Sequence, residues 1–216
     1  MIIEEIMKTD IITLQPEDTI HSALLIMREK KIRHIPIVDS EQHLLGLVTE
    51  RDIKDATPSP LFEKKRLEKE LTIPLEQIMN PNVITGHPLD FVEEVAGILY
   101  EHRIGCLPIV VNKKVVGIIT GTDILRTMVE LTGANQPGSQ IEIKVRNRTG
   151  ILHEVTGIFN QYHVNVHSVL VYPDKKDPNH KILVFRIQTM NPIIVIEHLK
   201  KNGYQVLWPN MPGMSL

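Results

Sequence analysis

Apolar and polar residues follow the same pattern twice along the first two thirds of the chain. "EIMKTDIITLQPEDTI" (residues 5–20) aligns without gaps on "QIMNPNVITGHPLDFV" (residues 77–92), and Ile, Met, Ile, Thr, Pro and Asp recur in identical places. The register continues through "EKKIRHIPIVD" and "EHRIGCLPIVV". Because self-similarity at a fixed spacing indicates one structural unit present more than once, we expect two copies, over residues 1–54 and 76–131.

Each copy predicts a β-α-β-β-α succession. An extended apolar stretch ("DIITL" or "NVIT") precedes a proline, Pro16 or Pro88, which is expected to open a helix with apolar residues at helical spacing. Two strands follow, "HIPIVD" and "LLGLVT" in the first copy and "CLPIVV" and "VVGIIT" in the second, each pair joined by a polar hairpin. A second helix is expected to begin at Asp52 or Asp123. One unit alone leaves an apolar face exposed, so we expect the two copies to pack as a pair.

A third unit follows the Gly- and Pro-containing stretch "LTGANQPGSQ". The strand pattern "IEIKV" leads into a turn and an amphipathic helix that starts near Ile151. Two strands, "VNVHSVLVYP" and "HKILVFRIQT", a second helix and a short last strand, "YQVLWP", complete the unit. The order β-α-β-β-α-β is the ferredoxin-like plan, so the chain as a whole predicts an α+β fold class.

The pattern divides the chain into five segments. They are the first repeat (1–54), a charged linker (55–75), the second repeat (76–131), a short hinge linker (132–139) and a C-terminal domain (140–216). Within the charged linker "KDATPSPLFEKKRLEKELTIP" we expect a short solvated helix. A functional basic patch at Lys64–Arg66 is the alternative, although neighbouring glutamates offset its charge.

Composition narrows the class of protein. The 216 residues are 42% hydrophobic and 23% charged, which suits a packed core with an ordinary solvated surface. A formal net charge of −2 argues against a broad nucleic-acid footprint. The single Cys106 lies in a strand pattern and is expected to be a buried thiol. The start of the chain does not resemble a signal peptide, and no apolar run approaches the roughly 18 residues of a membrane span, so we expect a cytoplasmic protein.

The candidate chemistry is concentrated in a motif that closes each repeat, "GLVTERD" and "GIITGTD". One interpretation is a capping box, in which Thr caps the following helix and the acid reaches back to a backbone N–H. The other is ligand binding, because a carboxylate can accept from two vicinal hydroxyls and the amides at a helix N-terminus favour an anion. The occurrence of the motif in both copies favours ligand binding, and the two roles are compatible in an empty site.

The two copies resemble a pair of CBS domains, in which this motif closes an adenosine site and the base lies between the repeats. The resemblance implies an adenosine ligand (AMP, ADP, ATP or S-adenosylmethionine) contacting eight residues: Thr13, Ile35, Thr49, Asp52, Thr85, Leu107, Thr120 and Asp123. Phosphate-binding candidates are Arg33, Arg51 and Arg126, for which a surface role is the alternative. Glu50 stands where the second copy has Gly121. Because an acid repels phosphate, we expect the two sites to differ in affinity.

The C-terminal stretch "NRTGIL", followed by "VNV", resembles the signature of ACT domains. In that family the Gly-containing turn lies where amino-acid effectors bind, which implies an effector turn at Asn147, Gly150 and Ile151. Asn147 stands where the family usually has Asp, so effector binding stays open. The alternative is that Gly150 only permits a tight turn and close helix packing.

The whole arrangement resembles the acetoin utilisation B proteins of Gram-positive bacteria, also through "LTGANQPGSQIEIKV" and "TMNP". This resemblance implies a link to acetoin or acetate catabolism and sporulation. We expect a non-catalytic nucleotide sensor that forms a homodimer and acts on a protein partner, with no metal and no catalytic cofactor. The alternatives are an amino-acid-sensing ACT regulator and a passive interaction module with a vestigial nucleotide site. An enzyme is the competing class, but no G-x-S-x-G, P-loop or Rossmann fingerprint is present.

Overall fold

The computed structural model describes residues 1–57 and 70–209, and the chain divides into two units, Met1–Leu125 and Arg126–Leu216. Most of the expected charged linker lies outside the described residues, including the short helix and the basic stretch at Lys64–Arg66. Among the described residues, no helix is long and apolar enough to cross a membrane.

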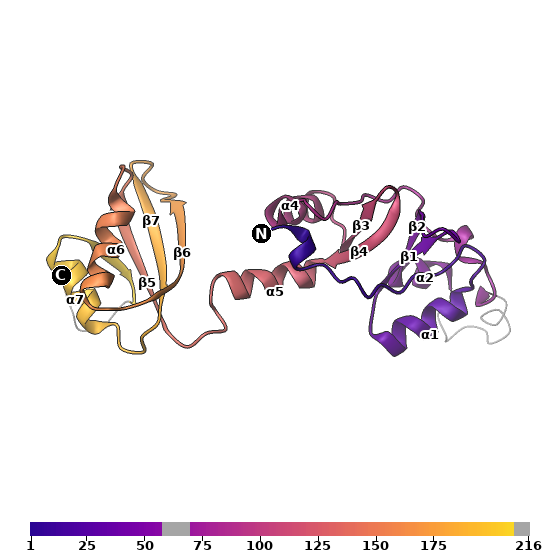
Figure 1. Cartoon of the computed structure of the whole chain (residues 1–216), viewed down its shortest axis with the longest axis horizontal. Coiled ribbons are helices and arrows are strands. Elements are labelled where there is room, and N and C mark those ends of the chain that lie inside the picture. Colours follow the sequence, from indigo (N-terminus) through magenta and orange to yellow (C-terminus); the bar gives the residue numbers. More distant parts are fainter. Residues whose placement is uncertain (58–69, 210–216) are drawn as a thin grey trace. The chain divides into compact units, whose positions relative to one another are not determined.

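The first unit contains both copies apart from the last residues of α5, and each copy is built around a two-stranded antiparallel sheet (Figure 1). The first copy consists of α1 (Ile20–Lys30), β1 (His34–Val38), β2 (Leu44–Thr49) and α2 (Glu50–Ala56). The second consists of α4 (Val92–Glu101), β3 (Cys106–Val111), β4 (Lys114–Thr120) and α5 (Gly121–Leu131). Both predicted hairpins are confirmed.

The stretches expected to be the first strands of the two copies do not form strands. Leu14 and Gly86 each contact the first hairpin strand of their own copy through a single parallel bridge. The ladder stops there because the next backbone donor on the hairpin strand would be Pro36 or Pro108, and proline has no N–H. The observed order is therefore an extended lead followed by α-β-β-α.

The first helix of each copy begins later than predicted. α1 starts at Ile20 rather than at Pro16, and α4 starts at Val92 rather than at Pro88. Each proline instead lies in a tight turn, which an Asp side chain closes by accepting from the preceding backbone N–H at 2.8 Å in the first copy and 2.7 Å in the second. Pro and Asp favour such turns, and this local geometry displaces the helix start.

The segment that precedes the first helix of each copy, here called its lead (residues 1–19 and 75–91), packs in the core of the other copy. Ile3, in the short 3-10 helix Ile3–Glu5, is fully buried among the apolar residues of the second copy. Leu75, in the short 3-10 helix Leu75–Gln77, is fully buried among those of the first. This exchange gives neither copy a complete core without the other.

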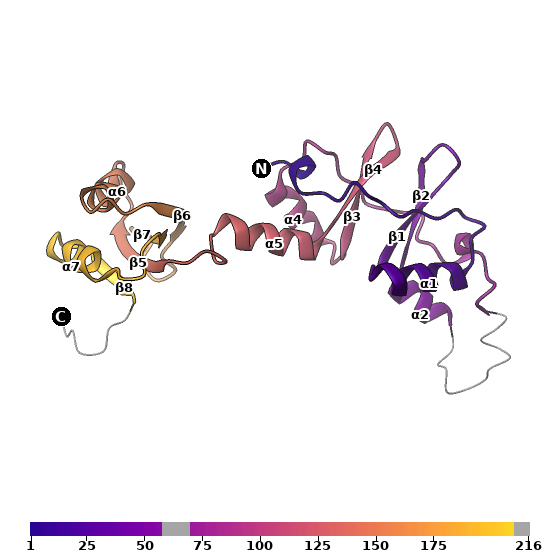
Figure 2. The ribbon, with the colours of Figure 1, turned by 60° about the horizontal axis from the view of Figure 1, so that its bottom comes forward.

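The exchange explains the glycine that opens each Thr/Asp motif. A Cβ added to Gly117 would overlap the Sδ atom of Met7, and one added to Gly46 would lie 2.6 Å from the Sδ atom of Met79. Glycine at these positions therefore leaves room for the methionine of the exchanged lead to lie against β4 or β2 as observed. Figure 2 shows the two hairpins side by side, and their tips pair at His43 and Lys114.

The second unit is a four-stranded antiparallel sheet in the order β6-β7-β5-β8, with two helices packed on it (Figure 1). Its elements are β5 (Ser139–Arg146), α6 (Ile151–Gln161), β6 (Val166–Pro173), β7 (His180–Ile187), α7 (Ile193–Lys201) and β8 (Gln205–Trp208). Alternate β5 residues, beginning with Ile141, are buried in a core that contains residues of both helices. The predicted ferredoxin-like order is confirmed.

The segment expected to act as a hinge is bonded to strands of the second unit. The carbonyl of Thr132 accepts from the Ser168 hydroxyl at 2.7 Å, and the carbonyl of Gln136 accepts from the Arg186 guanidinium at 2.8 Å. A Cβ added to Gly138 would overlap a β7 carbonyl oxygen. A hinge at these residues stays a prediction, and bending there would have to break these contacts.

Candidate functional site

The Thr/Asp motif of the first copy forms a capping box at the start of α2. Thr49 caps the helix, and its Oγ1 accepts from the Asp52 N–H at 3.3 Å. In return, Oδ2 of Asp52 accepts from the Thr49 N–H and the Thr49 hydroxyl, both at 2.7 Å. Among the described residues, the other carboxylate oxygen, Oδ1, makes no hydrogen bond or ion pair. That oxygen can accept from a ligand.

The motif of the second copy repeats the capping box but leaves no carboxylate oxygen open. The Thr120 N–H and hydroxyl donate to Oδ2 of Asp123 at 3.0 and 2.5 Å. Oδ1 lies 3.1 Å from Nζ of Lys8, which belongs to the exchanged lead of the chain. Asp123 is only 5% exposed. The two motifs therefore differ in access: the first carboxylate is open and the second is covered.

The charges at these motifs are set by their surroundings. Burial alone would raise the pKa of Asp123, but the hydrogen bonds from Thr120 and Lys8 outweigh burial and hold the pKa below its usual value. Burial, followed by the charge of Arg33, lowers the pKa of His34 against the opposing effect of Asp52. At neutral pH, Asp123 is therefore ionised and His34 is neutral.

Both motifs lie beside the contact between the two copies. β1 begins with His34 opposite Thr49, and β3 begins with Cys106 opposite Thr120. A Cβ added to Gly105, immediately before β3, would lie 2.9 Å from Nε2 of His34. The strand starts of the two copies therefore touch. The structure brings the four predicted Thr and Asp residues to this end of the paired hairpins.

The two residues that were predicted to contact the adenine base are buried. Ile35 and Leu107 have no exposed surface and belong to the cores of the two copies. A base could touch either side chain only after its neighbours move, so these contacts stay predictions. Thr13 is half-buried and Thr85 is exposed, each next to the single bridge that joins its lead to the hairpin.

The three phosphate candidates, Arg33, Arg51 and Arg126, are all exposed. Glu50, which was expected to repel phosphate, is paired with Lys54 at 2.7 Å. The hydrogen bond and charge of Lys54, with a smaller contribution from Arg33, lower the pKa of Glu50. Its negative charge is thus partly offset, which weakens the expected repulsion.

A cavity of about 900 Å³ lies over α1 and α2 of the first copy. Apolar side chains such as Leu24, Leu25 and Ile32 line it, with Arg33 and Glu50 also contributing. None of the motif Thr or Asp residues lines this cavity. Of the predicted nucleotide-site residues, only Arg33 lines it.

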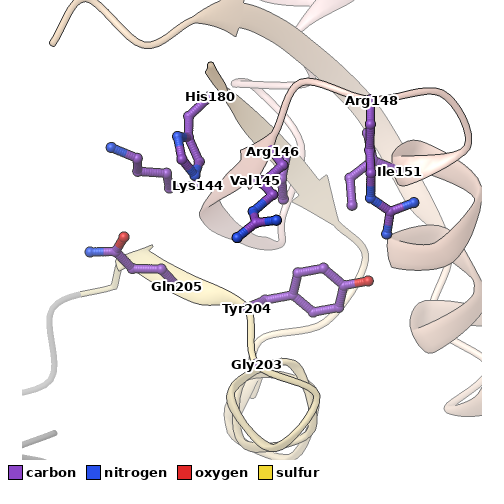
Figure 3. A pocket seen from close by; sticks show the side chains of 9 residues that line it. All are labelled: Lys144, Val145, Arg146, Arg148, Ile151, His180, Gly203, Tyr204 and Gln205. Atoms are coloured by element: carbon purple, nitrogen blue, oxygen red, sulfur yellow. The ribbon is translucent and has the colours of Figure 1, made fainter. Parts of the chain in front are cut away.

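In the second unit, the turn between β5 and α6 borders a pocket of about 320 Å³ (Figure 3). Of the predicted effector residues, only Ile151 lines it. Gly150 has φ +85° and no neighbour within 4 Å of an added Cβ. The glycine is therefore required by the backbone of the turn, and not by close packing.

Four basic side chains surround this pocket: Lys144, Arg146, Arg148 and His180. Three of them are paired with acids, Lys144 with Asp174, Arg148 with Glu154 and His180 with Asp177, each at 2.6 Å. Arg146 has no ion-pair or side-chain hydrogen-bond partner within the described part of the chain. Figure 3 shows its guanidinium pointing toward the middle of the pocket, above Tyr204.

Sequence reasoning missed Lys8 and the basic pocket. Lys8 is far from Asp123 along the chain, and the repeat alignment gives no sign that the leads are exchanged between copies. Lys144 and Arg146 alternate with apolar residues, as in any half-exposed strand, and His180 follows a polar turn, so no motif marked them. Among the described residues, no group of three or more His, Cys, Asp or Glu side chains is suited to hold a metal ion.

Two interlocked copies with a Thr/Asp box at the head of each last helix, joined to a ferredoxin-like domain, define a class of regulatory proteins assembled from small ligand-binding modules. The CBS-domain family model matches residues 3–59 and 75–130, more than half of the chain, and the ACT-domain model matches residues 139–203. The chain belongs to the CBS-domain family, and its C-terminal part is an ACT domain.

Two solved structures resemble the CBS pair. A protein from Vibrio cholerae described as an acetoin utilization protein (AcuB) is 32% identical, with a TM-score of 0.54, over 63% of this chain and 98% of that chain. The CBS domain pair of protein MJ0100, in complex with 5′-methylthioadenosine and S-adenosyl-L-methionine, is 30% identical. It has a TM-score of 0.52 and covers 63% of this chain and 98% of that chain.

Curated relatives share the CBS pair within proteins of different length. A homoserine O-acetyltransferase of Methanococcus vannielii is 35% identical over 128 residues, which are 59% of this chain but only 25% of that protein. A CBS domain-containing protein of Dictyostelium discoideum is 27% identical over 64% of this chain and 99% of its own length. The chain therefore spans about a quarter of the acetyltransferase, whose activity does not extend to it by similarity.

Proposed function

We propose that this protein is a non-catalytic regulatory sensor that binds an adenosine compound between its two CBS repeats. The observation that carries the proposal is the pair of carboxylates, Asp52 and Asp123, each held by a capping threonine beside the contact between the copies. A carboxylate fixed in this way can accept from the vicinal hydroxyls of a ribose. The adenosine ligands of the MJ0100 CBS pair support the choice of ligand class.

The other predicted residues take their places around this ribose site as proposals. Thr49 and Thr120 fix the carboxylates, and Thr13 and Thr85 lie in the leads where a ribose or base edge could reach them. Arg33, Arg51 and Arg126 are the exposed cations available to a phosphate. Contacts of a base with Ile35 and Leu107 require the core side chains around them to move.

Titration calorimetry on nucleotide-free protein tests the proposal with AMP, ADP, ATP and S-adenosylmethionine. Asp52→Ala and Asp123→Ala should each weaken binding at one site by about tenfold or more, because an unpaired ribose hydroxyl costs about 1–3 kcal/mol. Far-UV circular dichroism of each variant under the titration conditions is the control for folding, since both substitutions also remove a capping contact. No heat with any of the four compounds at millimolar concentration would exclude the proposed function.

We also propose that the sensor serves acetoin or acetate utilisation. The similarity to the Vibrio cholerae protein, which this chain matches over 98% of that protein's length, supports this role. Growth of the source organism on acetoin as sole carbon source tests it. A deletion strain should grow poorly, and a copy carrying both Asp→Ala changes should restore growth less well than the unchanged gene. Normal growth of the deletion strain would contradict the proposal.

A homodimer is the proposed assembly. Leu25 on α1 is 52% exposed and Leu125 on α5 is 65% exposed, so the helices present apolar side chains that a second copy could cover. Light scattering should give about twice the 24.6 kDa of one chain. A mass of one chain across micromolar concentrations would refute the dimer.

A second candidate function is binding of a carboxylate-bearing effector, such as an amino acid, by the ACT domain. The supporting observation is the Arg146 guanidinium, which points into the pocket beside the β5–α6 turn (Figure 3). An arginine fork matches a carboxylate with two parallel hydrogen bonds. A thermal-shift screen of amino acids on the wild-type protein and on Arg146→Ala tests this function. A shift that survives Arg146→Ala would place the effector elsewhere.

A further inference from the structure

The two ribose carboxylates differ in a contact that Lys8 makes. Nζ of Lys8 lies 3.1 Å from Oδ1 of Asp123, the oxygen that the capping threonine leaves open. A ribose hydroxyl that binds this oxygen therefore competes with the Lys8 ammonium for it. In the first copy, no described side chain competes in this way for Oδ1 of Asp52.

The backbone of Lys8 is held in place while its side chain can move. Its N–H and carbonyl both bond to Ile118 on β4 at 3.0 Å, and the neighbouring Met7 packs on Gly117. The Lys8 side chain is 54% exposed, whereas that of Asp123 is 6% exposed. A fixed backbone with a four-carbon flexible stem lets the ammonium leave the carboxylate and remain beside the same ligand.

Asn80 occupies the equivalent position in the other exchanged lead. Its backbone N–H and carbonyl bond to Leu47 on β2 at 2.9 and 3.0 Å, as Lys8 bonds to β4. Its side-chain oxygen accepts from the Asn82 N–H at 2.9 Å and brings no positive charge to Asp52. The same backbone position thus carries a cation at the second site and a neutral amide at the first.

We infer that Lys8 makes the second site selective for adenosine ligands with an anionic group on the 5′ carbon. This inference rests on the proposed adenosine function. When a ribose takes Oδ1 of Asp123, an anionic 5′ group gives the displaced ammonium a new charge-assisted partner. A neutral 5′ group leaves the ammonium without one. The discrimination therefore comes from the lead segment and not from the Thr/Asp motif itself.

AMP and 5′-methylthioadenosine are the appropriate probes, because they share the adenosine and differ in the charge on the 5′ carbon. In an Asp52→Ala background, which leaves only the second site, AMP should bind at least tenfold more tightly than 5′-methylthioadenosine. Lys8→Asn, which copies the first site, should reduce that preference about tenfold. Lys8→Arg should keep the preference, while Lys8→Met, which keeps the stem without the charge, should lose it.

The reciprocal change supplies the matched control. In an Asp123→Ala background, Asn80→Lys should raise the preference of the first site for AMP, and this gain should shrink as salt increases because the added attraction is electrostatic. If both compounds bind but the preference is the same with Lys8, Asn and Met, the inference is wrong and the proposed function stands. If the second site binds neither compound while the first binds both, the inference is also overturned. If neither site binds an adenosine compound, the proposed function itself fails.

Discussion

Replacing the glycine of each Thr/Asp motif by alanine tests whether the exchanged leads lock the two CBS copies together. A Cβ at position 46 would lie 2.6 Å from Sδ and 2.9 Å from Cγ of Met79, and 3.1 Å from the carbonyl oxygen of Asn80. At position 117 the neighbours are all atoms of the Met7 side chain. Methionine can adjust through three rotatable bonds, whereas the Asn80 carbonyl is fixed by its bond to β2.

The two substitutions should therefore differ in magnitude. Overfilling a packed interior typically costs about 1–3 kcal/mol. We expect Gly46→Ala to lower the free energy of unfolding by about 2–3 kcal/mol, near the upper end of this range, because the backbone at Asn80 has to shift. Gly117→Ala should cost less, about 1–2 kcal/mol, because the Met7 side chain can move aside. Gly97→Ala is the matched control: nothing lies within 4 Å of its added Cβ, so it should stabilise α4 by about 0.5–1 kcal/mol.

Denaturant unfolding followed by far-UV circular dichroism measures these differences on the full chain. The single Trp208 lies on β8 of the ACT domain, so its fluorescence reports a transition that should not change. A double-mutant cycle with Met79→Ala completes the test, because removing the methionine should relieve part of the cost of Gly46→Ala. If Gly46→Ala unfolds with the same free energy as the wild-type protein, the packing account of the motif glycine is wrong.

Three further changes probe charge and burial. Burial raises the pKa of the Cys106 thiol to about 12, so iodoacetamide at pH 8 should label it only in denaturant; fast labelling of the native protein would contradict this. Because the folded-state pKa of Asp123 is lowered from 3.8, its contribution to stability is present above that pH and is lost as pH falls through the folded value. The destabilisation by Asp123→Asn should thus be largest at pH 7 and should shrink as pH falls below 3.8, and equal losses at pH 7 and at pH 3 would refute the argument. Lys144→Met removes the partner that lies 2.6 Å from Asp174 and should lower the unfolding midpoint of the ACT domain, followed by Trp208 fluorescence. An unchanged transition would show that this pair contributes little.

The elements that could be predicted from sequence are those with a local cause. Both CBS hairpins follow from alternating apolar residues with a polar turn, and the four ACT strands follow from the same signal. The two first strands were wrong because the pattern of "DIITL" and "NVIT" does not show that the partner position is a proline. The helix starts at Pro16 and Pro88 were wrong because a proline followed by an acid two residues later also suits a turn.

The exchange of the leads could not be predicted, because a repeat alignment does not specify which copy receives each segment. Met7 and Met79 occupy matching places whether they pack on their own copy or on the other one. The Thr/Asp boxes were predictable, since spacing alone fixes a capping box. Their difference in access depends on Lys8, whose approach to Asp123 is a consequence of the exchange. The same limit explains why Ile35 and Leu107 were chosen as base contacts although both are fully buried.

Coupling between a nucleotide and the ACT domain stays a proposal, and the segment between the second repeat and the ACT domain is where it can be tested. A nucleotide can shift the equilibrium between two arrangements of the CBS repeats only by as much as its affinities for the two arrangements differ. The Gly133–Gly138 segment is short and rich in turn residues, which favoured a hinge there. Yet the carbonyls of Thr132 and Gln136 are bonded to strands of the ACT domain, and Gly133, with φ +66°, packs against His167. Asp123 lies in the first turn of α5, which ends at Leu131 immediately before these bonds. We therefore propose α5, which carries Asp123 and ends immediately before the anchored segment, as the element to test for such coupling.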